Sequence, residues 1–106
     1  KDLRLTTIDL VCVNLYNFAE AVRQTLEDKQ AVEQIDIGGP TMLRASAKNF
    51  HSVAVIPDPS YYMECMREMR ENGGSLTLEF RKRMAVATFA LTADYDRMIT
   101  EYLSRS

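Results

Sequence analysis

Residues 8–13 read IDLVCV, a run rich in β-branched residues and apolar almost throughout. Such continuity is typical of a strand buried on both faces of a parallel sheet. A second run of this kind, VAVI, occupies residues 53–56, and helical patterns at 18–26, 31–35 and 40–50 lie between the two. The last of these should begin at the glycine pair before Pro40, a residue suited to a first helical position. The order predicts α/β architecture with parallel pairing and flanking helices.

Two helices are expected after the second strand. Asp58 should cap a helix that begins at Pro59 and ends at Gly73-Gly74, and a long C-terminal helical pattern runs from Leu76 to Leu103. The first is expected to pack into the core through Tyr62, Met63, Cys65, Met66 and Met69. The buried face of the second is expected to comprise Leu78, Met84, Ala85, Ala87, Phe89, Tyr95, Ile99 and Leu103.

Two further expectations concern the sheet and a cationic run. Two strands make a poor sheet, so we expect this one to be part of a larger sheet or to be completed by another polypeptide. Residues 81–83 read RKR, and because Glu79 precedes them in an acidic chain, a solvated helix face is the better reading than a phosphate clamp.

Composition excludes several classes of protein. The 106 residues carry 13 basic and 15 acidic side chains, a net charge of −2, and the 46% apolar content is that of an ordinary globular domain. No basic lobe exists for nucleic acid or an anionic membrane surface. The longest apolar run, Leu10 to Val13, is far shorter than the roughly 20 residues of a membrane span. With no leader pattern, a cytoplasmic location is expected.

Cysteine and histidine usage gives no sign of a metal site. Cys12 and Cys65 lie in apolar patterns and are predicted to be buried thiols, not a disulfide. His51 is the only histidine, so the usual zinc ligand sets and a histidine-activated nucleophile lack their components. A solvated surface or helix-end histidine is the expectation for His51.

Polar residues gather where a ligand would be expected. Ligands of parallel sheets bind beyond the carboxyl ends of the strands, and Asn14, Tyr16 and Asn17 follow the first strand at that edge. Residues 36–39 read DIGG and precede a helix whose N-terminal N–H groups favour negative charge. A tight turn before the proline explains the glycines equally well.

One helix face suggests proton transfer. Thr41, Arg44 and Lys48 form a polar stripe at i, i+3 and i+7, and Asp36 is a candidate anion between the two cations. A lysine beside a carboxylate in a cleft makes a proton-transfer pair. The alternative is a lysine that favours the C-terminal helix dipole, together with a surface Arg-Asp pair, and periodicity does not decide between them.

Several stretches together resemble a known family. These stretches are IDLVCVNLYNF at 8–18, VEQIDIGGPTMLRASAKN at 32–49, DPSYY at 58–62, LEFRKR at 78–83 and TADYD at 92–96. They look like the IMP cyclohydrolase domain of the bifunctional AICAR transformylase/IMP cyclohydrolase family. The resemblance implies a methylglyoxal-synthase-like α/β fold. It also implies dehydrative ring closure of 5-formamidoimidazole-4-carboxamide ribonucleotide to IMP, in the cytoplasm.

The resemblance also implies ligands and partners. The ring closure requires no metal and no organic cofactor, whereas 10-formyltetrahydrofolate would serve the transformylase domain. The partners implied are the purine nucleotide and a second copy in a homodimer.

Roles of individual residues follow from the same resemblance. Lys48 matches the active-site lysine and Asp36 the aspartate beside it, so they are expected to handle the carboxamide proton and the departing water. Tyr16 matches a tyrosine near the formyl oxygen. The nucleotide is expected to contact Val13, Asn14, Asp36, Ile37 and Gly38, with backbone groups of Val13, Ile37 and Gly38 holding it.

The sequence departs from the family pattern in several places. Asn17 replaces a proline and Leu91 a histidine, and neither the family's upstream phosphate-binding half nor its transformylase domain is found in the sequence. We therefore expect residues 1–106 to be the C-terminal portion of one cyclohydrolase domain, with little activity alone. Two alternatives are a nonenzymatic nucleotide-binding or assembly module of the same fold and, by fold analogy, a methylglyoxal-synthase-like lyase.

Overall fold

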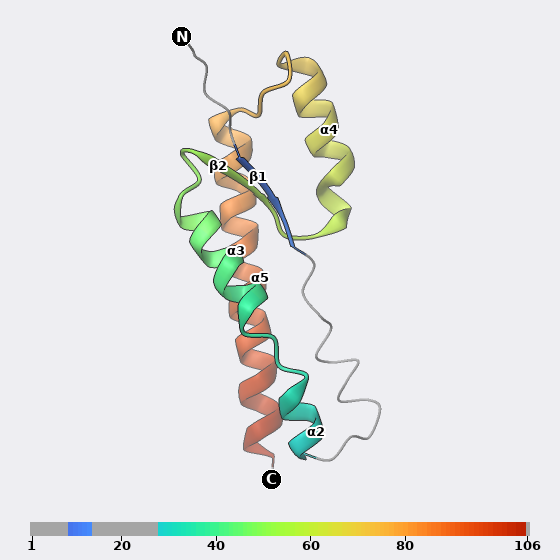
Figure 1. Ribbon diagram of the computed structural model, residues 1–106, viewed down its shortest axis with the longest axis vertical. Helices are drawn as coiled ribbons and strands as arrows, with labels where there is room; N and C mark the ends of the chain where they lie inside the picture. Colours follow the sequence, from blue (N-terminus) through green and yellow to red (C-terminus); the bar gives the residue numbers. More distant parts are fainter. Residues whose placement is uncertain (1–8, 14–27, 106) are drawn as a thin grey trace.

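The computed structural model describes residues 9–13 and 28–105. Its elements are β1 (Asp9–Cys12), α2 (Asp28–Glu33), α3 (Gly38–Lys48), β2 (Val53–Ile56), the 3₁₀ turn η1 (Pro59–Tyr61), α4 (Tyr62–Glu71) and α5 (Leu78–Ser104). The two strands are parallel, with Asp9 opposite Val53 and Cys12 opposite Ile56. Figure 1 shows α3 running back against the strands and alongside α5. The predicted α/β architecture, parallel pairing and long C-terminal helix are confirmed.

The two strands differ in burial. Ala54, Val55 and Ile56 of β2 are buried, whereas Leu10 of β1 is 47% exposed and Cys12 is exposed. The prediction that the first strand is buried on both faces is therefore wrong for the described part of the chain. The reason is that β1 has a described neighbour, β2, along one edge alone, while β2 also contacts α3 and α5.

The two cysteines follow the same division. Cys65 is buried as predicted, but Cys12 is exposed, so the prediction of two buried thiols is wrong for Cys12. Burial is the largest cause that raises the pKa of the Cys65 thiol, and the neighbouring Cys12 and Glu68 raise it further. Cys65 therefore remains protonated at neutral pH.

Helix ends lie close to where the local sequence predicts them. α3 begins at Gly38, the first of the glycine pair, so Pro40 is its third residue; a proline fits there because first-turn N–H groups have no acceptor within the helix. Asp58 caps η1 by accepting the Ser60 N–H at 3.0 Å. After α4, Gly73 and Gly74 have φ of 63° and 90°, which glycine adopts without strain. The predicted helix at 18–26 lies outside the described residues.

The core lies where α3, β2, α4 and α5 meet. It comprises Leu43, Ala47, Ala54, Val55, Ile56, Cys65, Leu76, Phe80, Met84 and Ala85. The predicted core positions Leu78, Phe89 and Leu103 of α5 are exposed, as are Tyr62, Met63 and Met66 of α4. These predictions are wrong because each helix contacts the rest of the described protein along one stripe, and these residues lie off it.

Arg81 contradicts the prediction of a solvated cationic run. Its side chain is buried, with Nε donating to the Phe50 carbonyl and Nη1 to the Leu76 carbonyl, both at 2.9 Å. It thereby ties the loop after α3 to the segment before α5. Lys82 and Arg83 are exposed as predicted, and Arg83 pairs with Glu64 at 2.6 Å.

We expect Arg81→Met to lower the free energy of unfolding by about 2 to 4 kcal/mol, because two buried carbonyl groups lose their donor. Urea denaturation followed by circular dichroism measures this. Arg67→Met is the matched control, since Arg67 is exposed on α4 and has no described partner. Equal stability of the two variants would contradict a structural role for the Arg81 guanidinium.

Candidate functional site

The loop between α2 and α3 is held at Asp36. The Asp36 carboxylate accepts the Gly39 N–H at 2.9 Å, and the Asp36 backbone N–H donates to the Tyr95 hydroxyl at 2.8 Å. Tyr95 is 3% exposed and belongs to α5, so a buried side chain of the longest helix supports the loop. Asp36 itself is half-buried. Two hydrogen bonds therefore hold the loop at Asp36.

The first amides of α3 leave room for a ligand. Ile37 and Gly38 are exposed, and among the described residues the structure gives their N–H groups no acceptor. A Cβ placed at Gly38 would meet no atom within 4 Å. Free N–H groups at a helix N-terminus bind anions or oxygen atoms that gain negative charge. The arrangement can hold such an oxygen beside the Asp36 carboxylate.

Val13 directly follows β1, at the carboxyl end of the strand. Figure 1 shows that both strands run toward the end of the molecule from which α3 starts. The residue after β1 and the loop before α3 therefore both belong to the carboxyl-end region predicted for ligands. The Val13 N–H donates to the Ile56 carbonyl at 3.3 Å, which fixes Val13 at the end of β2. Asn14, Tyr16 and Asn17, predicted at the same edge, lie outside the described residues.

Lys48 lies at the far end of α3 from Asp36. Gly38 and Lys48 are ten positions apart in α3, which at a rise of about 1.5 Å per residue is about 15 Å. Lys48 is exposed and pairs with no carboxylate of the described residues. Arg44 pairs with Asp96 at 3.6 Å. The prediction that Asp36 lies between Arg44 and Lys48 is therefore wrong, and the structure brings no direct Asp36–Lys48 contact within the chain.

Tyr95 is the supporting residue that sequence reasoning missed. The sequence predicts it only as a core residue, and the separation of 59 positions from Asp36 hides the contact from any local pattern. Its place in the TADYD stretch at 92–96 was the one available signal.

We expect Tyr95→Phe to destabilise the protein by about 1 kcal/mol, since it removes one hydrogen-bond acceptor while keeping the ring. The Asp36 amide should then exchange its hydrogen faster, which NMR-detected exchange measures. The Gly39 amide, bonded to the Asp36 side chain instead, is the internal control. Unchanged exchange at Asp36 would show that the Tyr95 hydroxyl does not hold the loop.

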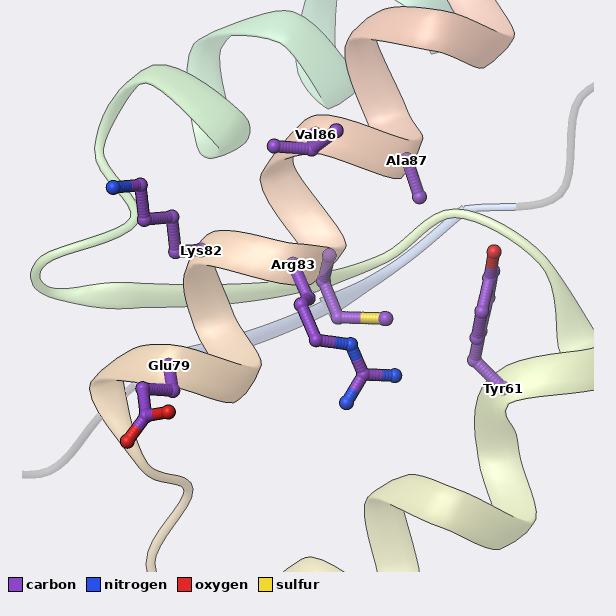
Figure 2. Close-up of a pocket in the computed structure, with 7 residues that line it drawn as sticks. Tyr61, Glu79, Lys82, Arg83, Val86 and Ala87 are labelled. Carbon is purple, nitrogen blue, oxygen red and sulfur yellow. The ribbon is translucent and has the colours of Figure 1, made fainter.

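A cavity of about 490 Å³ lies elsewhere, between α5 and the start of α4. Tyr61, Met84, Val86 and Ala87 form its apolar wall, and Glu79, Lys82 and Arg83 its charged rim. Figure 2 shows the Arg83 guanidinium and the Tyr61 ring facing the opening from opposite elements. Arg83 of this rim is paired with Glu64 of α4. None of the predicted site residues lines this cavity.

Residues 9–13 and 28–105 contain neither a candidate metal-binding cluster nor a candidate membrane span. No group of three His, Cys, Asp or Glu side chains is placed there to hold a metal ion. His51 is exposed and stacks on Phe50 with ring centroids 4.5 Å apart, in agreement with the prediction of a surface histidine. No helix in this part of the chain is long and apolar enough to cross a membrane.

Comparison with known proteins decides the family. The family model described as "AICARFT/IMPCHase bienzyme" matches residues 46–106, more than half of the chain. The chain belongs to this family. The bifunctional purine biosynthesis proteins PurH of Microcystis aeruginosa and Trichormus variabilis are 49% and 50% identical to it over 102 residues. Each match covers 95% of this chain and 20% of the relative.

A more distant relative gives the same result. PurH of Limosilactobacillus reuteri is 44% identical over 104 residues, which is 97% of this chain and 20% of that protein. The chain thus spans about a fifth of the length of the curated relatives it matches. Members of the AICARFT/IMPCHase family carry two activities, and residues 46–106 alone do not say which of them this stretch serves.

Proposed function

We propose that this chain contributes to IMP cyclohydrolase activity, the ring closure of 5-formamidoimidazole-4-carboxamide ribonucleotide to IMP in purine biosynthesis. The observation that carries the proposal is the Asp36 loop, a carboxylate beside the first amides of α3, in a chain of the AICARFT/IMPCHase family. The stretch at 32–49 that resembles the cyclohydrolase domain contains this loop. The fold proposed with it is methylglyoxal-synthase-like.

The reaction needs orientation and proton transfer. The carboxamide nitrogen attacks the formyl carbon, and a tetrahedral intermediate forms. The formyl oxygen then leaves as water, with one proton from the carboxamide nitrogen and one from the formamido nitrogen. Because both reacting groups lie on one imidazole ring, proximity is supplied by the substrate. The protein must move two protons and stabilise the oxygen while it is negative.

The described residues suit parts of this task. The Ile37 and Gly38 amides and the Val13 carbonyl would hold the nucleotide, and Asp36 would accept a proton from it. Lys48 and Tyr16 are proposed as the other proton-handling groups. Because Lys48 lies about 15 Å along α3 from Gly38, it would act without touching Asp36 of the same chain. No metal or organic cofactor is assigned to this step, and 10-formyltetrahydrofolate is proposed for the transformylase activity of the family alone.

The setting of the chain is also proposed. Residues 1–106 would form the C-terminal portion of one cyclohydrolase domain in a cytoplasmic, homodimeric bifunctional protein. The 20% coverage of the relatives and the two-stranded sheet support the part of this proposal that makes the chain a portion of a domain.

The test is a chimera in which this chain replaces the matching stretch of the Microcystis aeruginosa PurH. Ring closure is followed by the rise in ultraviolet absorbance as IMP forms. We expect turnover by the chimera and none by the 106-residue chain alone. A folded chimera that binds IMP but does not close the ring would contradict the proposal and favour a nonenzymatic nucleotide-binding module.

A further inference from the structure

The two cysteines of the chain lie on either side of one residue of β2. Cys12, the last residue of β1, lies opposite Ile56 in the parallel register. Cys65 of α4 belongs to the same core cluster as Ile56. Figure 1 shows α4 starting from the end of the sheet at which β1 also ends. The fold therefore brings together two thiols that are far apart in the sequence.

An electrostatic effect supports this proximity. The neighbouring Cys12 raises the pKa of the Cys65 thiol, in addition to the larger effect of burial. Such an effect requires that the two groups lie close to each other, because charges more than about 10 Å apart are largely screened. The two thiols therefore form one local cluster.

The two thiols differ in their access to solvent. Cys12 is exposed, whereas Cys65 is 4% exposed. A reagent in solution can reach the first thiol and not the second. This asymmetry suits thiol–disulfide exchange, in which an accessible thiolate reacts first and a resolving thiol beside it completes the exchange. In a reducing compartment such bonds are transient, which distinguishes them from permanent structural disulfides.

We propose that Cys12 and Cys65 form a redox-reactive pair that a small disulfide, such as oxidised glutathione, converts into a reversible intramolecular disulfide. The Cys12 thiol loses its proton to solvent and attacks one sulfur of the reagent, which forms a mixed disulfide and releases one glutathione. Cys65 then loses its proton and attacks the Cys12 sulfur, which releases the second glutathione. Two protein thiols are oxidised, and one reagent disulfide is reduced to two thiols. Excess reduced glutathione reverses both steps.

The new bond would join β1 to α4. Among the described strands β1 has β2 as its neighbour, so hydrogen bonds along one edge hold it in the sheet. A covalent link between distant parts of the sequence restricts the unfolded chain. We therefore expect the oxidised chain to resist unfolding more strongly than the reduced chain. This inference does not depend on the ring-closing activity proposed above.

Mass spectrometry of the 106-residue chain after incubation with oxidised glutathione tests the pair. We expect the wild-type chain to lose two hydrogen atoms, to retain no glutathione and to yield one linked peptide that contains both cysteines. Cys65→Ala should retain one glutathione on Cys12, because no second thiol displaces it. Cys12→Ser should gain none, because Cys65 is 4% exposed. Circular dichroism verifies that each variant folds.

Urea denaturation is the second measurement. The midpoint of the oxidised wild-type chain should rise by about 1 M and should return to its original value after reduction with dithiothreitol. Cys12→Ser, treated with the same reagent, is the matched control and should keep its midpoint. A wild-type chain that retains glutathione, forms a disulfide with a second chain or does not react would overturn the proposal. An intramolecular bond that leaves the midpoint unchanged would contradict the native proximity of the two thiols.

Discussion

Replacing Lys48 by alanine is expected to lower ring-closing turnover of the chimera by a factor of about 100 or more, the usual effect of losing a general acid or base. Lys48 is exposed at the last turn of α3 and contacts no carboxylate of the described residues, so its loss should leave the fold intact. The measurement is kcat under saturating substrate, with circular dichroism to verify folding.

Two further variants separate charge from proton transfer at this position. Lys48→Arg keeps the positive charge but cannot give up a proton at neutral pH, so it should be nearly as inactive as the alanine variant. Lys29→Ala removes an exposed lysine of α2 and should keep wild-type turnover. Recovery of full activity by Lys48→Arg would show that Lys48 supplies charge alone, and wild-type turnover by Lys48→Ala would remove it from the reaction.

Features controlled by neighbouring residues were predictable from the sequence. The glycine pair that begins α3, the Asp58 cap of η1 and the glycines after α4 each act over a few residues, and the structure has them where the sequence predicts them. β2 was predicted at its observed bounds for the same reason, because an apolar run closed by Pro57 leaves little freedom.

Features that depend on distant contacts were not predictable. Arg81 looks like one member of a surface cationic run, and its burial depends on carbonyl groups that the loop after α3 and the segment before α5 present. The exposure of Leu10, Met63 and Phe89 has the opposite origin, since apolar residues pointed to a core but no described element covers them. Hydrophobic periodicity identifies the apolar face of a helix, but it does not show whether another element packs against that face.

The candidate site also has one part that the local sequence predicts and another that depends on a distant contact. The Asp36 turn was predicted as a ligand-binding loop, and its geometry follows from the DIGG stretch at 36–39. Its support by Tyr95 crosses 59 positions of the chain. The pairing of Asp36 with Lys48 neglected the length of α3, which the helical pattern itself already predicted.

The carboxylate of Asp36 has two functions that substitutions can separate. Its oxygen accepts the Gly39 N–H at the start of α3, and its charge is proposed to accept a proton from the substrate. Asp36→Asn keeps an oxygen that can accept the same N–H, so we expect normal stability and turnover lowered about 100-fold. Asp36→Ala should show a similar loss of turnover and also lose about 1 kcal/mol of unfolding free energy. Urea denaturation and the absorbance assay on the chimera give the two quantities.

Asp58 provides the matched control for this separation, because it accepts the Ser60 N–H at 3.0 Å outside the candidate site. Asp58→Ala should lose a comparable part of the unfolding free energy while turnover stays at the wild-type level. A capping function alone would instead make Asp36→Asn as active as the wild type and would make Asp36→Ala resemble Asp58→Ala. Loss of turnover in Asp36→Asn at unchanged stability therefore assigns the charge of Asp36, and not the hydrogen bond that shapes its loop, to the reaction.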